Sequence, residues 1–444
     1  MILGGIKGLT KNKTYKKYKE SIKWCNEEGI KLEKKFFFMK DKYIIFIFSL
    51  YIADLLLITK TSFTGDIRTQ DIATLLAVPI FFYALKRINV NFNINKIILS
   101  ISVYFLYLLI TNLIIYATGI NSIKFIFYII KELEYMIGML IVFYCGVYHR
   151  EKMIKIISIL IFINIIYGVC QFGLGKISYY GIGAISDSNP AASGLVYFMC
   201  AILSFIIFIN KKNSKYIIYF ILSIGLTILT ISKTNILGVV IFIAIYVVLY
   251  IMYRCINKII KIKKTNILII ANCIIAMIIL VVIADITRLD SIILENDFIS
   301  RIIYRFSRSG HSFSFRMNKA EYYYNSIIGD SVLRTLFGAG KGIPEYYFKA
   351  SALGVDNQYV RFIIEMGYLG TSLWIIQLGF IGVKLRKASS KVYLFAFIAL
   401  FISYLGMGIG FEVFQTTRSG LAFWILTGLI LGMGYNQKNM EYFQ

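Results

Sequence analysis

The chain has 444 residues, of which 58% are hydrophobic and only 16% are charged, and its formal net charge is +25 at pH 7. A soluble multidomain protein of this length carries about 25% charged residues and far fewer long apolar runs. The composition therefore excludes an ordinary soluble enzyme and indicates a polytopic membrane protein.

Apolar segments follow one another along most of the chain. A membrane-spanning helix needs about 20 mostly apolar residues, and about twelve segments meet or approach this length. These segments lie near residues 43–58, 71–85, 97–117, 123–147, 153–173, 190–209, 216–232, 235–253, 266–284, 360–383, 392–410 and 419–434. The expected fold class is therefore all-α, with about 12 transmembrane helices and one large loop that contains short helices. A β-barrel would need short alternating strands, which these runs are not.

Lysine and arginine gather in the first 42 residues and in every second connector. The positive-inside rule then places the basic segment 1–42 and the tail 435–444 in the cytoplasm, and the polar loop 285–359 outside. Helices one to nine are expected within 43–284, and helices ten to twelve within 360–434. We attribute the surplus positive charge to this topology and to anionic lipids, and not to nucleic-acid binding.

The sequence lacks the usual metal-binding patterns. Its six cysteines form no CxxC pair, and it contains only two histidines, His149 and His311. Zinc and copper sites in proteins are normally built from these residue types. We therefore expect no metal and no other cofactor.

Charged side chains also occur inside or beside the predicted spans. Lys131, Glu132 and Glu134 stand in the fourth span and Asp54 in the first. A buried ion in a bilayer costs at least a few kcal/mol, so these groups either neutralise one another or line a polar cavity or proton path. Lys233 stands at the outer end of the seventh span, where the positive-inside rule does not explain a cation. It is a candidate ligand for pyrophosphate, with ordinary snorkelling as the alternative.

The external loop 285–359 carries arginines at helical spacing. Arg301 and Arg305 share one face of a predicted amphipathic helix that is suited to the membrane surface, and Arg316 lies on a second helix, predicted over 314–328. A guanidinium group beside a membrane binds the phosphate or pyrophosphate of a lipid bidentately. The alternative is a face that only contacts headgroups or solvent.

A glycine-rich turn follows this second helix. Gly338, Gly340 and Lys341 superficially resemble a phosphate-binding loop, but Thr335 stands where the first glycine should be, and Gly342 follows the lysine in place of Ser or Thr. The turn therefore does not predict an ATPase. Its backbone amides are suited either to a small anion-binding nest or to a plain tight turn.

The loop ends in a predicted helix start. Asp356 and Asn357 directly precede the tenth span, where either residue type is a good N-cap. Arg361 and Glu365 are spaced i, i+4 and are expected to pair. Gly367 and Gly370 permit close packing of the helix that contains them.

The order of these features resembles the O-antigen polymerase and O-antigen ligase superfamily of bacterial polysaccharide assembly. Members have about a dozen spans, a large external loop late in the chain, a loop arginine, a Phe-Gly-x-Gly turn, and a His-Asn or Asp-Asn pair opening a helix that reads Glu-x-Gly-x-x-Gly. The matching positions are Arg316, Phe337-Gly338-Ala339-Gly340, Asp356-Asn357-Gln358-Tyr359, Glu365-Met366-Gly367-Tyr368-Leu369-Gly370 and, with lysine in place of arginine, Ser232-Lys233-Thr234. The motifs cover about residues 310–375, and the rest of the likeness is topology alone. Ligases typically carry histidine where this chain has Asp356, which favours the polymerase branch.

The resemblance implies a metal- and nucleotide-independent glycosyltransferase at the outer face of the bacterial cytoplasmic membrane. It would transfer a growing glycan from undecaprenyl pyrophosphate onto a lipid-linked repeat unit, beside membrane lipids, a flippase and a chain-length regulator. Asp356 is the first choice as general base and Glu365 the second, with Arg316 stabilising the leaving pyrophosphate. The other residues expected to bind substrate are Lys233, Arg301, Arg305, Gly338, Gly340, Asn357, Tyr359 and Arg418.

Two other functions fit the same sequence. The ligase branch would transfer the glycan to a different acceptor. A flippase or proton-coupled carrier would instead use Lys131, Glu132, Glu134 and Asp54 as an ion path. The long external loop favours an enzyme over a transporter.

Overall fold

The computed structural model describes residues 41–57, 69–117, 124–174, 182–185, 190–257, 309–347, 355–388, 390–414 and 417–435. Regular structure in these ranges is helical, which confirms the all-α class. A first helix includes residues 41–56. The helices that follow are α2 (Thr69–Phe92), α3 (Asn95–Ala117), α4 (Lys124–Tyr148), α5 (Arg150–Gly173), α6 (Pro190–Lys211), α7 (Lys215–Leu229), α8 (Lys233–Ile256), α11 (Ser309–Ile327), α12 (Val332–Phe337), α13 (Ile343–Tyr347), α14 (Gln358–Arg386), α15 (Lys391–Gly408) and α16 (Thr417–Gly434).

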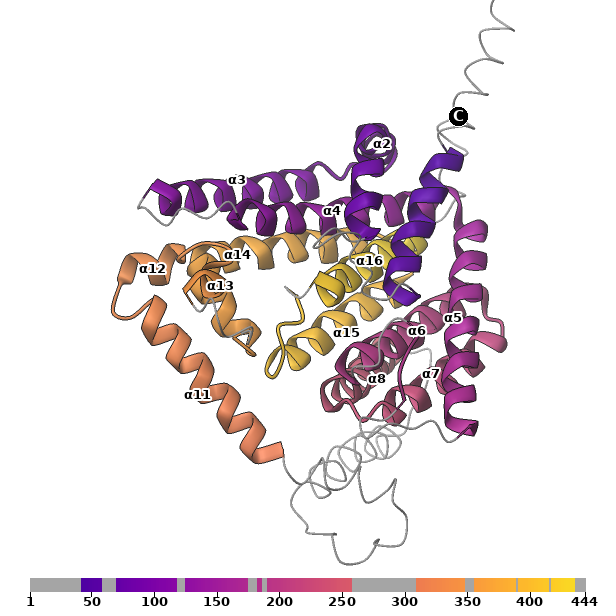
Figure 1. Ribbon diagram of the computed structural model, residues 1–444. Coiled ribbons are helices and arrows are strands. Elements are labelled where there is room, and N and C mark those ends of the chain that lie inside the picture. The colour runs from indigo at the N-terminus through magenta and orange to yellow at the C-terminus, as the bar shows by residue number, and fades with distance from the viewer. Residues whose placement is uncertain are drawn as a thin grey trace, which may run out of the picture.

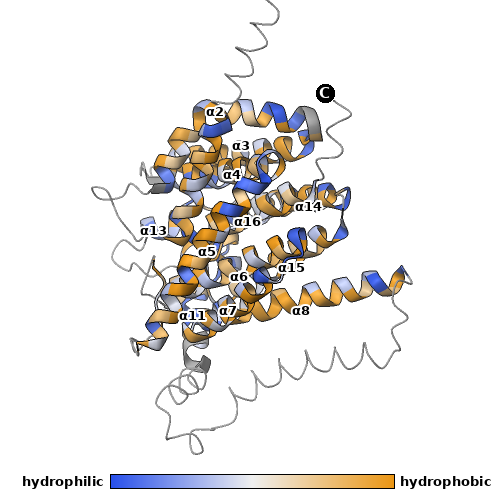
Figure 2. Ribbon diagram, turned by 90° about the vertical axis from the view of Figure 1, so that its right-hand side faces the viewer, coloured by the Kyte–Doolittle hydropathy of each residue, from blue (hydrophilic) through white to orange (hydrophobic). Residues whose placement is uncertain are grey.

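Six helices in the described part of the chain are long and apolar enough to cross a membrane: α3, α5, α6, α8, α14 and α15. This finding corrects the expected number of about twelve. Helices α7 and α16 are apolar but shorter, α4 carries Lys131, Glu132 and Glu134, and the segment 266–284 lies outside the described residues. Figure 2 shows α8 apolar along most of its length. The long apolar helices indicate a multi-pass membrane protein.

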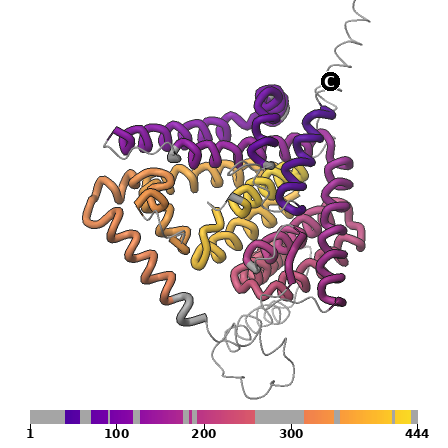
Figure 3. The backbone as a smooth tube through the Cα atoms, in the orientation of Figure 1, coloured from indigo at the N-terminus to yellow at the C-terminus, as the bar shows by residue number. Residues whose placement is uncertain are grey.

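The helices pack around α4, α14 and α16. Figure 1 shows α3 and α4 beside α14 and α16, with α5 to α8 gathered at one side and α11 at the other. The backbones of α4 and α16 approach closely, because a Cβ added to Gly146 would lie 2.8 Å from the Cα of Gly432. Small residues allow such close contact between membrane helices. The tube in Figure 3 runs from α11 through α12 to α13, and all three helices contact α14, so the described part of the predicted external segment contacts the helical bundle directly.

Helix α14 is broken at Gly367. Its φ of 63° and ψ of −174° lie in a region that is essentially restricted to glycine, and they divide the helix into residues 358–366 and 368–386. The turn after α12 donates hydrogen bonds to carbonyl groups at the end of the first part of α14. The amides of Ala339 and Gly340 donate to the carbonyls of Ile364 and Glu365, at 2.7 and 3.1 Å. The Phe-Gly-x-Gly turn and the Glu-x-Gly helix are therefore in direct backbone contact.

The helix break explains two glycines of these motifs. A Cβ on Gly367 would lie 2.4 Å from the carbonyl oxygen of Leu336, and one on Gly338 would lie 2.5 Å from that of Glu365. Both glycines also have positive φ. At Gly370, a Cβ would meet the ring of Tyr107 in α3 at 2.5 Å, which confirms the expected close packing of this helix. The hydroxyl of Tyr107 completes the junction by donating to the carbonyl of Met366 at 2.6 Å.

We expect Gly367→Ala to lower the free energy of unfolding by about 3 kcal/mol or more, because the alanine would be strained and would clash with the backbone of the turn. Gly379→Ala is the matched control in the same helix, since an added Cβ there meets nothing within 4 Å. It should be neutral or slightly stabilising. The measurement is the thermal unfolding midpoint of each purified variant in detergent. Equal midpoints for the two variants would show that the break at Gly367 is not required.

Candidate functional site

Three segments meet where α14 begins: helix α11, residues 355–361, and the loop 409–414 that joins α15 to α16. Arg316 of α11 donates a hydrogen bond to the carbonyl of Gly410 in this loop. The ammonium group of Lys319, one turn further along α11, lies 2.8 Å from Oδ2 of Asp356. Arg316, the predicted cation, and Asp356, the predicted carboxylate, therefore both lie where these three segments meet.

Asn357 forms the N-cap of α14, as the sequence predicts. Its side-chain oxygen accepts hydrogen bonds from the amides of Tyr359 and Val360, at 3.0 and 3.1 Å. Its side-chain nitrogen lies 3.4 Å from the carbonyl of Ile409. Asn357 is buried, so its capping role is structural. The prediction that it also contacts substrate stays a prediction.

Asp356 differs from its neighbour in exposure and in backbone conformation. Its side chain remains 31% exposed, and its φ of 58° lies in the left-handed region. Asp and Asn adopt this region more readily than other non-glycine residues. A carboxylate that is held at one oxygen and open to solvent is suited to accept a proton from a substrate hydroxyl.

The loop 409–414 is the part of this site that the sequence does not predict. Glu412 accepts a hydrogen bond from the amide of Asp356 at Oε1, at 3.1 Å. The amide of Phe414 donates to the side chain of Gln358, at 2.8 Å. The only local sign of a role for Glu412 in the sequence is that it is an acid in a short connector between two apolar segments. Its role becomes visible only in the folded chain, where this connector packs against Asp356.

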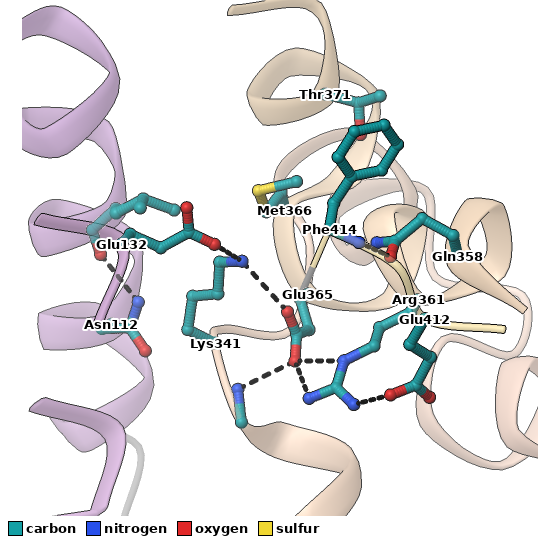
Figure 4. Close-up of polar contacts among 12 residues, drawn as sticks. Asn112, Glu132, Lys341, Gln358, Arg361, Glu365, Met366, Thr371, Glu412 and Phe414 are labelled. Carbon is teal, nitrogen blue, oxygen red and sulfur yellow. Dashed lines mark hydrogen bonds and ion pairs between the residues drawn. The ribbon is translucent and has the colours of Figure 1, made fainter. Parts of the chain in front are cut away.

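A buried ion network includes two residues of the first part of α14, Arg361 and Glu365, and Figure 4 shows Lys341 and Glu412 pointing toward them. The guanidinium group of Arg361 pairs with Glu345, Glu365 and Glu412. The i, i+4 pair between Arg361 and Glu365, with Nη2 2.9 Å from Oε1, confirms the expectation from the sequence. Arg361 thus joins α13, α14 and the loop 409–414 through one side chain.

Lys341 extends this network into the helical bundle. Its ammonium group lies 2.7 Å from Oε1 of Glu132 in α4 and 3.3 Å from Oε2 of Glu365. The amide of Gly342 donates to Oε1 of Glu365 at 3.1 Å. The anion held by the glycine turn is therefore the carboxylate of Glu365, a group of the protein itself. Lys341 is 3% exposed and neutralises part of the charge that the sequence places in α4.

The two candidate bases have different surroundings. Glu365 is fully buried and contacts Arg361, Lys341 and the amide of Gly342, which is the geometry of a group that fixes the structure. Asp356 is accessible. In the same network, burial raises the pKa of the Glu345 carboxyl above its ordinary value, although 38% of that side chain is exposed and Arg361 opposes the rise.

The remaining predicted residues lie at several places. Lys233 is the first residue of α8, and Arg418 lies in the first turn of α16. Tyr359 is partly exposed, and its hydroxyl donates to the carbonyl of Leu405 at 2.6 Å. Arg301 and Arg305 lie outside the described residues.

The glycines of the turn and the charged residues of the first helix and α4 are the other predicted groups. The amides of Gly338 and Gly340 are bonded to the carbonyls of Arg334 and Glu365, so a pyrophosphate contact from these glycines stays a prediction. Asp54 and Glu134 are buried, and Glu134 accepts a hydrogen bond from Gln70 at 3.3 Å. In the described ranges, no group of three or more His, Cys, Asp and Glu side chains is placed to hold a metal ion.

No protein-family model and no curated protein matches the sequence.

Proposed function

We propose that the protein is a polysaccharide polymerase. It transfers a growing glycan from undecaprenyl pyrophosphate onto a lipid-linked oligosaccharide repeat unit at the outer face of a bacterial cytoplasmic membrane. Cytoplasmic termini and an external 285–359 loop belong to this proposal, as do a flippase and a chain-length regulator as partners. The glycan would be an O-antigen, a capsule or an exopolysaccharide.

One observation carries the proposal. Arg316 and Asp356 come from different segments, yet the same loop contacts both, through the Gly410 carbonyl and the Glu412 carboxylate. A glycosyl transfer from pyrophosphate needs a cation for the leaving group and a base for the attacking hydroxyl, close together. These two residues supply that pair in the positions that the resemblance assigns to the site.

The proposed reaction is a single displacement with inversion. The acceptor hydroxyl oxygen forms a bond to the anomeric carbon of the donor sugar while the bond from that carbon to the pyrophosphate oxygen breaks. Asp356 takes the hydroxyl proton, and the electron pair of the broken bond leaves with the pyrophosphate. Arg316 stabilises the charge that develops there. Lys319 holds one oxygen of the Asp356 carboxylate, which leaves the other oxygen for the acceptor.

A transporter of lipid-linked oligosaccharides is the second candidate function. The buried network of Glu132, Lys341, Glu365, Arg361 and Glu412 favours it, because buried charges inside a membrane protein often mark an ion path. A ligase-type transfer to another acceptor uses the same chemistry as the polymerase and differs only in its product.

The test supplies purified protein in detergent with lipid-linked repeat units and resolves the products by size. A polymerase is expected to produce a ladder of lengthened glycans, because no membrane is needed to separate two sides. A transporter lengthens nothing in detergent and instead moves the substrate across the bilayer of a proteoliposome. A ligase produces a ladder-free shift that depends on an added acceptor. If folded, monodisperse protein produced no lengthened glycan in this assay, the polymerase would be excluded.

A further inference from the structure

Glu412 uses its two carboxylate oxygens for two different partners. Oε1 accepts a hydrogen bond from the backbone amide of Asp356 at 3.1 Å, and Oε2 pairs with the guanidinium group of Arg361. The side chain is 6% exposed, so water competes little for either oxygen. A hydrogen bond between a buried carboxylate and a backbone amide is charge-assisted and stronger than a neutral one. The Asp356 amide is therefore held firmly.

The backbone conformation of Asp356 needs a contact that stabilises it. A non-glycine residue with a φ of 58° is in a sparsely populated region, and surrounding contacts must maintain it. The contact with Lys319 fixes the carboxylate of Asp356, but it comes from a flexible side chain on another helix. The contact with Glu412 acts directly on the backbone. It thereby sets the direction in which the Asp356 side chain leaves the chain.

The loop that carries Glu412 is itself anchored. The ring of Phe414 packs against Trp374 of α14 and Phe423 of α16, with ring centroids 4.7 and 4.9 Å away. The amide of Phe414 donates to Gln358 in the first turn of α14. At the other end of the loop, the carbonyl of Ile409 accepts a hydrogen bond from Asn357. Because both ends of this short segment are tied to the bundle, it is suited to serve as a rigid support for Asp356.

We infer that Glu412 is a positioning residue that fixes Asp356 for proton acceptance through the Asp356 backbone amide. Its pair with Arg361 orients the Glu412 carboxylate, and the hydrogen bond to the amide transmits that orientation to Asp356. The inference deepens the proposed function and rests on it for the activity measurement. A second measurement, hydrogen exchange, is independent of the reaction.

Amide hydrogen exchange, read by mass spectrometry with fragmentation to single residues, tests the contact itself. In Glu412→Ala, the Asp356 amide is expected to exchange about tenfold faster than in the wild type, because it loses a charge-assisted hydrogen bond. Glu412→Gln retains one accepting oxygen, which can serve the Asp356 amide or Arg361 but not both, so its exchange should fall between that of the wild type and that of Glu412→Ala. Glu321→Ala, at an exposed acid on α11, is the control and should change nothing. Unchanged exchange in Glu412→Ala overturns the inference.

A double-mutant cycle in the polymerisation assay tests the consequence. Glu412→Ala is expected to lower kcat about tenfold or more with little change in KM, and Glu412→Gln, with one accepting oxygen, should recover part of that loss. In an Asp356→Asn background, Glu412→Ala should cause no further loss of kcat, because the carboxylate that Glu412 positions is then absent. Independent, additive losses overturn the inference. A wild-type protein that lengthens no glycan contradicts the proposed function alone, since the exchange experiment still decides the role of Glu412.

Discussion

Asp356→Asn is expected to reduce glycan lengthening by about 10²- to 10⁴-fold, the range that a general base contributes. The substitution removes the proton-accepting charge and little else. Asparagine tolerates a positive φ as well as aspartate does, and it retains the backbone amide that Glu412 binds. Its side-chain oxygen still accepts a hydrogen bond from Lys319. The loss of activity should therefore occur without loss of the fold.

The matched control is Asp330→Asn, at an exposed aspartate in the turn between α11 and α12. It makes the same chemical change in the same segment and should retain wild-type activity. Initial rates of lengthening are measured for both variants at equal amounts of monodisperse protein, with equal unfolding midpoints as the criterion of folding. A folded Asp356→Asn variant that lengthens repeats at the wild-type rate would show that the base assignment is wrong.

The parts of the site that sequence could predict are local. Asn357 caps α14 because a side-chain oxygen at this position reaches the next amides, and Arg361 meets Glu365 because residues four apart share a helix face. Both contacts depend on helix geometry alone. The contact of Glu412 with Asp356, and that of Lys341 with Glu132, join segments far apart in the chain. Such contacts depend on how the helices pack, and local patterns in the sequence do not reveal that packing.

The number of spans was not predictable for a related reason. Hydropathy scores each segment by its own composition, so it accepted the fourth segment despite Lys131, Glu132 and Glu134. The fold places the ammonium group of Lys341 against Glu132 and thus compensates a charge that would be costly in lipid. Apolar runs in the sequence therefore outnumber the helices in the described residues that are long and apolar enough to cross a membrane.

Arg361→Met is expected to cause a large loss of stability, about 3–5 kcal/mol in the free energy of unfolding. Arg361 is 6% exposed and is the common partner of Glu345, Glu365 and Glu412. Its removal leaves Glu365 and Glu412 buried with less compensation, and the like charges then repel one another. Methionine replaces much of the volume, so the effect reports on charge and not on a cavity. Thermal unfolding in detergent measures the loss.

Two further variants separate charge from geometry at this position. Arg361→Lys keeps a cation but cannot reach three carboxylates with a planar fork, so its unfolding midpoint should fall between those of the wild type and Arg361→Met. Arg386→Met makes the same substitution at an exposed arginine near the end of the same helix and should change stability by about 0.5 kcal/mol or less. If Arg361→Met unfolded at the same temperature as Arg386→Met, the ion network would not be what holds α13, α14 and the 409–414 loop together. The support of Asp356 by Glu412 would then have to rest on the aromatic packing of Phe414.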